Sequence, residues 1–118
     1  MQLFRYALIS TMVFFMSCED DSNEVDNLRV VTYKVEGSST ASITLETDEG
    51  GVAQFANKHL PWTKTYQEFE RGDFVYLSAQ NDGNSGFVRV TILVDNLSWK
   101  STISSGAYVI ATATGSLE

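Results

Sequence analysis

The sequence predicts an all-β domain, an immunoglobulin-like β-sandwich of about seven short antiparallel strands. Apolar and polar residues alternate along several short runs, as in 29–36, where Val31, Tyr33 and Val35 share one face. Alternation with period two indicates a half-buried strand, and β-branched residues are enriched in these runs. Glycine, asparagine and aspartate gather between the runs, and no window after residue 27 sustains helical spacing. A small barrel is the alternative architecture.

The turn residues mark where one expected strand ends and the next begins. We expect a strand at 29–36, followed by a hairpin of 41–47 with the weaker run 52–57. The intervening Asp-Glu-Gly-Gly segment favours a turn because glycine accepts positive φ. Pro61 cannot donate to a ladder, so 60–62 is expected to form a corner. The remaining strands are expected at 63–70, 74–80, 87–94, 99–103 and 107–114.

The run 87–94 is the best candidate for a central strand. Its alternate residues Val88, Val90, Ile92 and Val94 form one apolar face. The glycine- and asparagine-rich segment 81–86 before it is the strongest turn signal in the chain. A strand with so apolar a face is expected to lie against the core of the domain.

The first 17 residues have the composition of an export signal. Arg5 supplies the positive start, 7–16 an uncharged apolar run, and Ser17 a small residue before Cys18. Secretory signals combine these features, and a run this short does not span a bilayer, which takes about 20 residues. Cys18 is the only cysteine of the chain and follows the position where a lipoprotein peptidase cuts. We therefore expect removal of 1–17 and attachment of lipid to Cys18.

The residues around Cys18 indicate the type of lipoprotein. Phe15 and Met16 occupy the places where the usual lipobox has leucine and a small residue. This relaxed pattern is similar to that of Bacteroidetes-type bacteria, and the acidic tract after Cys18 resembles the surface-export signals of that group. We expect a lipid anchor in the outer membrane, with the domain at the cell surface or in the periplasm. The alternatives are an ordinary cleaved signal that leaves a free cysteine, which is a liability in an oxidising compartment, and a short anchor that is never cut.

Charge divides the mature chain into a tether and a domain. The chain carries 15 acidic and 8 basic residues. We expect 18–27 to be a solvated tether because it lacks apolar periodicity and is rich in acids. These acids are Glu19, Asp20, Asp21, Glu24 and Asp26. The remaining 28–118 suffices for one core and lacks the basic stripe of a nucleic-acid-binding protein, so no nucleic-acid partner is expected.

Five phrases in the domain occur in an order that is similar to a known family. They are VTYKVEG (31–37), LPW (60–62), YLSAQN (76–81), ILVDN (92–96) and SSGAYVIATATGSL (104–117). Together they resemble the extracytoplasmic domain of the MmpS family, small membrane proteins named from mycobacteria. The resemblance implies a β-sandwich that faces the exterior and an accessory role for lipid and siderophore exporters. This chain departs from the family in its expected lipid anchor, where the relatives have a transmembrane helix, and in Val90 and Ala113, where many relatives carry a cysteine pair.

The sequence contains no convincing catalytic set. His59 is the only histidine, and neither a nucleophile-elbow pattern nor the converging ligands of a zinc site accompany it. We therefore expect no enzyme activity, no metal and no cofactor. The chain is expected to be a non-enzymatic binding or accessory module, with the membrane as one partner through its lipid and an envelope protein or exporter as another.

Aromatic residues are the candidates for ligand binding. Trp99, Trp62 and Tyr66 are among the aromatics that exceed what a core this small needs. Exposed aromatics on a rigid sheet would form a platform for a sugar, a lipid or a protein, and core packing is the alternative for each of them. Trp99 follows a turn and has polar neighbours in sequence, so it is expected to be the most exposed of the three.

Lipidation of Cys18 is tested by the intact mass of protein extracted from membranes. We expect a chain that begins at Cys18 and carries added acyl groups. Cys18→Ala should abolish the acyl mass and release the protein from the membrane, since two or three acyl chains suffice for stable anchoring. A mass that begins at Met1 without acyl chains would exclude the lipoprotein assignment.

Overall fold

The computed structural model describes residues 27–118, which are almost entirely β-strand. The expected signal peptide, the lipidation site at Cys18 and the acids of the tether lie outside the described residues. The strands are β2 (Leu28–Gly37), β3 (Thr40–Glu46), β4 (Val52–His59), β5 (Trp62–Glu70), β6 (Phe74–Asn81), β7 (Phe87–Val94), β8 (Leu97–Ser105) and β9 (Ile110–Ser116). Within this part of the chain, no helix has the length and apolar character to cross a membrane.

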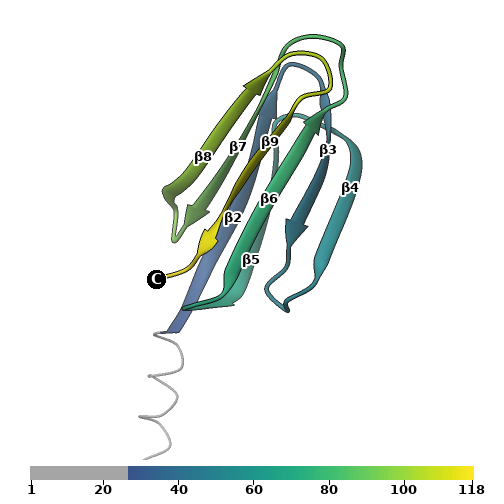
Figure 1. Ribbon diagram of the computed structural model, residues 1–118. Coiled ribbons are helices and arrows are strands. Elements are labelled where there is room, and N and C mark those ends of the chain that lie inside the picture. Colours follow the sequence, from purple (N-terminus) through teal and green to yellow (C-terminus); the bar gives the residue numbers. More distant parts are fainter. Residues whose placement is uncertain (1–26) are drawn as a thin grey trace, which may run out of the picture.

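The strands form two antiparallel sheets packed face to face. One sheet has the order β5-β2-β7-β8 and the other the order β4-β3-β6-β9 (Figure 1). The predicted all-β sandwich is confirmed, although the domain has eight strands where about seven were expected. The extra strand is β4, because the weak run 52–57 extends to His59 and pairs with β3 on both sides of a bulge. Immunoglobulin constant domains divide seven strands four and three, whereas here the two sheets are equal.

The core lies between the inner faces of the sheets and follows the predicted alternation. Val31, Tyr33 and Val35 of β2 are fully buried. The other buried apolar residues come mainly from β7 in the same sheet and from β3 and β6 in the facing sheet. They are Val88, Val90 and Ile92 of β7, Ile43 and Leu45 of β3, and Val75, Leu77 and Ala79 of β6. Burial of an aliphatic side chain stabilises the fold by about 1.5–3 kcal/mol, so these central strands supply most of the hydrophobic stabilisation.

The strand ends define two ends of the sandwich. β2 begins at the same end as the β3–β4, β5–β6 and β7–β8 turns, close to the chain's C-terminus (Figure 1). We call this the near end because the N-terminal segment joins the domain there. The opposite, far end carries the β2–β3, β4–β5, β6–β7 and β8–β9 connections. The peptide bond between Leu60 and Pro61, in the predicted corner at the far end, is cis.

A buried asparagine joins the loops of the far end. The Asn81 Nδ2 group donates to the carbonyls of Ser85 at 2.9 Å and Gly106 at 3.0 Å. Its Oδ1 accepts from the Gly83 amide at 3.0 Å, so the side chain is fully satisfied although it is only 1% exposed. Buried polar groups require such partners. Asn81 therefore fixes the β6–β7 and β8–β9 loops relative to each other.

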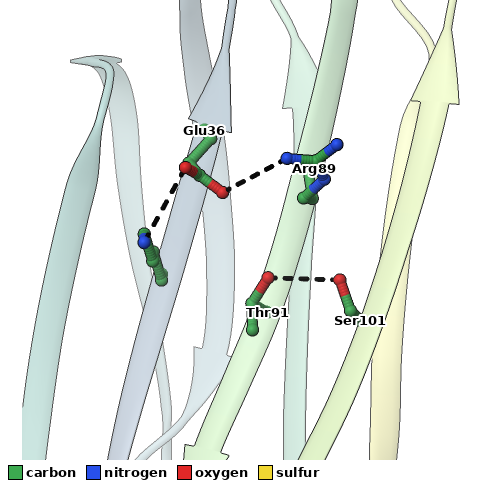
Figure 2. Close-up of polar contacts among 5 residues, drawn as sticks. Glu36, Arg89, Thr91 and Ser101 are labelled. Carbon is green, nitrogen blue, oxygen red and sulfur yellow. Dashed lines mark hydrogen bonds and ion pairs between the residues drawn. The ribbon is translucent and has the colours of Figure 1, made fainter. Parts of the chain in front are cut away.

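Hydroxyl and charged groups cover the outer face of β2, β7 and β8. Glu36 lies 3.7 Å from both Lys34 Nζ and Arg89 Nη1, and Thr91 shares a 3.2 Å hydrogen bond with Ser101. Figure 2 shows Glu36 between the two basic side chains. Exposed ion pairs of this kind contribute about 0–1 kcal/mol. The ion pairs on this face therefore add little to the stability of the fold.

The edge strands differ in regularity. β5, β8, β4 and β9 lie at the sheet edges. The register shifts between Arg29 and Val31 against β5, between Ala41 and Ile43 against β4, and at Ile92 against β8. β9 alone pairs with its neighbour without any shift. Bulges twist an edge and hinder pairing with another chain, so three of the four described edges are protected in this way.

Tyr33→Phe tests the buried hydroxyl of the core, which donates to the Glu46 carbonyl at 2.7 Å. Burial raises the pKa of Tyr33 above its ordinary value of about 10, so the unfolded chain ionises first as the pH rises. The raised pKa contributes to the free energy of unfolding. This contribution is fully present below about pH 10 and is lost as the pH rises above that value. We expect the free energy of unfolding to fall more steeply above about pH 10 in the wild type than in Tyr33→Phe. At neutral pH the variant should be less stable by about 1 kcal/mol.

Urea denaturation at a series of pH values measures both effects. The other tyrosines are common to the two proteins, so the difference between the two curves belongs to Tyr33. Parallel pH profiles would contradict the buried position of this hydroxyl.

Candidate ligand-binding site

The two sides of the sandwich differ in how closely the sheets meet. β8 and β9 lie in contact with each other, whereas the backbones of β4 and β5 lie farther apart. Inward-facing side chains of both sheets therefore reach solvent between β4 and β5. We call this the open side of the sandwich, and two of the three aromatic residues singled out from the sequence lie on it.

Three aromatic side chains from the two edge strands meet on the open side. Trp62 and Tyr66 of β5 pair with the buried residues Val35 and Val31 and therefore face inward. Phe55 of β4 pairs with the buried Ile43 and faces inward from the other sheet. All three are half-buried and pack against the core. We call Phe55, Trp62 and Tyr66 the aromatic cluster.

Ring contacts hold the aromatic cluster in place. The ring centroids of Phe55 and Trp62 lie 5.1 Å apart with an interplanar angle of 50°. Tyr66 makes an edge contact with the buried Tyr33 at 6.0 Å and 72°. These separations fall in the range of favourable aromatic pairs. The exposed parts of the rings are thus presented by side chains whose inner parts the core already fixes.

A basic and an acidic side chain lie near Tyr66 and affect its ring contacts and its pKa. The Lys64 ammonium lies 5.6 Å from the centroid of its ring, a cation–π distance. Burial, and to a smaller extent the negative charge of Asp48, raises the pKa of Tyr66. Its hydroxyl therefore stays protonated at neutral pH and remains available as a hydrogen-bond donor.

An acidic cleft of about 320 Å³ lies on the same side of the molecule at the near end. It is lined by the β3–β4 turn, the end of β5 and the start of β6. Six carboxylates and no basic side chain line it, namely Glu46, Asp48, Glu49, Glu68, Glu70 and Asp73. Among residues 27–118, no group of three or more potential ligands is arranged to hold a metal ion.

Two of the carboxylates of the acidic cleft have structural roles. Asp48 Oδ2 accepts from the Glu68 amide at 3.1 Å, which connects the β3–β4 turn to edge strand β5. Asp73 Oδ2 accepts from the Glu70 amide at 2.8 Å and closes the β5–β6 turn. The remaining carboxylates give the cleft a negative potential. Such a potential attracts cationic groups and hydrogen-bond donors.

Trp99, which was expected to be the most exposed of the three candidates, lies on the opposite side of the sandwich and is half-buried, as are Trp62 and Tyr66. It is the extra residue of the β8 bulge, since Ile92 pairs with Lys100 and Leu93 pairs with Ser98. The bulge turns the indole inward until it packs on the backbone of β9. A Cβ atom at Gly115 would lie 2.7 Å from its ring. Trp99 is accordingly half-buried and packed against the core.

Only weak local signals point to the rest of the site. Phe55 lies in the run 52–57, whose alternation is too weak to indicate an inward-facing aromatic residue. The acids of the cleft come from the end of β3, the β3–β4 turn, the end of β5 and the β5–β6 turn, which are separated in sequence and meet only in the fold. His59 is exposed at the far end of β4, where it pairs with Thr40.

No family model matches this chain, and no curated protein matches it either. The similarity to the MmpS domain therefore stays a prediction from the five phrases that carry it.

Trp99→Ala separates packing from ligand binding at this residue. Because the indole covers Gly115, we expect a loss of about 2 kcal/mol, half the cost of truncating a fully buried tryptophan. This corresponds to a fall in Tm of about 8–16 °C for a domain of this size. Leu97→Ala is the matched control on the same strand, since Leu97 is 73% exposed and its truncation should change stability by less than about 0.5 kcal/mol. An unchanged Tm for Trp99→Ala in thermal denaturation would contradict the packed position.

Proposed function

We propose that this chain is a lipid-anchored lipoprotein of the cell envelope and that its sandwich is a non-enzymatic binding module. The observation that carries the proposal is the aromatic cluster. Phe55, Trp62 and Tyr66 come from edge strands of both sheets and expose part of each ring on the open side, and the acidic cleft lies at the near end of that side. Partly exposed aromatics beside a polar cleft are typical of a recognition surface.

The rigidity of the aromatic cluster supports binding. All three rings already pack on the core, Phe55 and Trp62 also pack on each other, and Tyr66 packs on Tyr33, so a ligand need not immobilise them. Side chains that are ordered before association reduce the entropic cost of binding. The aromatic rings would contact an apolar face of the ligand, and the acidic cleft would bind its cationic or hydrogen-bond-donating groups. A basic segment of an envelope protein has both properties.

The lipid anchor would set the orientation of this surface. Cys18 precedes Leu28 by ten residues, a segment that spans at most about 35 Å when extended. The near end of the sandwich would thus face the membrane and the open side would stand beside the anchor. A partner held in or on the same membrane can reach such a surface without approaching the far end.

The exporter accessory role is the second candidate. The phrases that carry the resemblance to the MmpS domain lie in β2, the start of β5, β6, the end of β7, the end of β8, β9 and adjoining loops. That resemblance supports docking on an exporter of envelope lipids or siderophores. Under this candidate the partner is a large protein with many membrane spans.

The test is a pull-down from native membranes with the anchored wild-type protein and with Trp62→Ala plus Tyr66→Ala. We expect the double variant to lose at least about tenfold in recovery of the specific partner, because buried aromatic anchors dominate many interfaces. Tyr108→Ala is the matched control, since Tyr108 is an exposed aromatic on the β8–β9 loop. It should retain full recovery.

Two further measurements complete the test, namely the folding of each variant and the identity of the recovered partner. Circular dichroism must show that each variant keeps the wild-type spectrum. Recovery that is equal in the double variant and the wild type would overturn the open side as the binding site. A multispan exporter as the recovered protein would select the accessory role, and any other envelope protein would select the general binding module.

A further inference from the structure

Edge strand β9 is unprotected, unlike the other three edges. Residues 101–117, which include the end of β8, the β8–β9 loop and all of β9, contain no charged side chain. β9 pairs with β6 in continuous register and contains neither a bulge nor proline. Natural proteins protect edge strands with charges, bulges or proline, because unpaired backbone groups otherwise pair with another chain.

The other edges have both kinds of protection. β4 contains Lys58, β5 contains Lys64, and β8 contains Lys100. Each of these strands also has a register shift against its neighbour. The contrast within one domain indicates that the bare edge of β9 is a specific feature of this sandwich rather than a general property of its edges.

The hydrogen-bonding pattern shows which backbone groups of β9 face outward. The Asn81 amide donates to the Val109 carbonyl and the Leu117 amide donates to the Asp73 carbonyl. Both pairs continue the β6–β9 register, so the odd-numbered residues of β9 exchange hydrogen bonds with β6. The groups of the alternate residues therefore point to the free edge. These residues are Ile110, Thr112, Thr114 and Ser116.

A side-chain contact at Ile110 agrees with this direction. Ser104 Oγ donates to the Ile110 carbonyl at 2.9 Å from the side of β8. The near-end part of β9 is less accessible, because Lys100 and Trp99 of β8 lie close to Gly115. The stretch open to another strand is thus Ile110–Thr114.

Apolar side chains lie beside this stretch. Ile110 and Tyr108 are each 56% exposed. Tyr108 has a φ of 56°, which is uncommon for a bulky residue and costs of order 1–3 kcal/mol. Exposed aliphatic and aromatic groups beside an unprotected edge add apolar contact to backbone pairing.

We propose that β9 pairs antiparallel with β9 of a second copy of this chain, with a twofold axis at Thr112. The distribution of charge indicates that the strand paired with β9 comes from a second copy. The chain has a net charge of −7, and the carboxylates of the acidic cleft lie on the opposite side of the sandwich. Two copies of an acidic protein can approach most closely where neither carries charge, and 101–117 is that surface.

The pairing is self-complementary. Thr112 lies opposite Thr112 of the second copy, and Ile110 lies opposite Thr114 of the second copy. The outward N–H and C=O groups of these residues then form the bonds of an ordinary ladder, in which the Ile110 carbonyl accepts a second hydrogen bond beside that from Ser104 Oγ. The two four-stranded sheets become one continuous sheet. A single strand pair buries less surface than a standard interface of about 1,600 Å², so the dimer is expected to dissociate in the micromolar range or above.

Sedimentation equilibrium tests this dimer on the full chain carrying Cys18→Ala, so that no acyl group drives association. Thr112→Lys places two like charges directly opposite each other, which opposes pairing. We expect it to weaken dimerisation by about tenfold or more. Thr65→Lys is the matched control, because Thr65 is an exposed threonine of edge strand β5 bonded to Thr32 as Thr112 is to Ser78.

Disulfide trapping gives an independent measurement that does not depend on a destabilising charge. Thr112→Cys in the same Cys18→Ala background should form a dimer through a disulfide, because the Cα atoms of such a pair lie about 5.5 Å apart. Thr65→Cys should remain mainly monomeric under the same oxidation. Loss of the dimer in Thr112→Lys alone, with selective trapping at position 112, supports the proposal. A wild-type monomer at high concentration, or a dimer unaffected by Thr112→Lys, overturns it.

Discussion

The domain depends on the packing of β2 and β7 against β3 and β6. These central strands carry most of the fully buried side chains, and the single cysteine of the chain lies outside the described domain. With no disulfide within the sandwich, burial of apolar surface must outweigh the conformational entropy that folding removes. The one large polar side chain in this layer, Tyr33, is accommodated because its hydroxyl reaches the Glu46 carbonyl.

Because the centre of each sheet supplies the stability, the edge strands are free to differ. On one side β8 approaches β9, and Trp99 fills the gap over Gly115. On the other side β4 and β5 remain apart and the aromatic cluster closes the core only partly. The same inward-facing geometry packs Trp99 on β9 and places the half-buried rings of Trp62 and Tyr66 on the open side. What distinguishes them is the local separation of the sheets rather than the type of side chain.

Charged side chains are also distributed unequally between the two sides of the sandwich. Six carboxylates line the cleft beside β5, whereas 101–117 along β8 and β9 has no charge. A ligand on the open side and a second copy at β9 would occupy opposite edges of the sandwich and would not compete. At the far end, Asn81 joins the loops that flank β9, so the exposed residues next to that edge are held on a rigid framework.

The sequence alone determined the strand class, the approximate strand positions and the inward faces, because alternation is a local pattern that any sheet must satisfy. It also determined the turns, since glycine, proline and asparagine act through their own backbone preferences. It placed β9 too early, at 107–114 instead of Ile110–Ser116, because the Tyr108 loop continues the apolar pattern. Only the tertiary structure decided which strands lie at the edges, that Trp99 turns inward at a bulge, and that the acids of two distant turns share one cleft. Those outcomes depend on sheet order and on the distance between the sheets, which are set by long-range packing of the whole core.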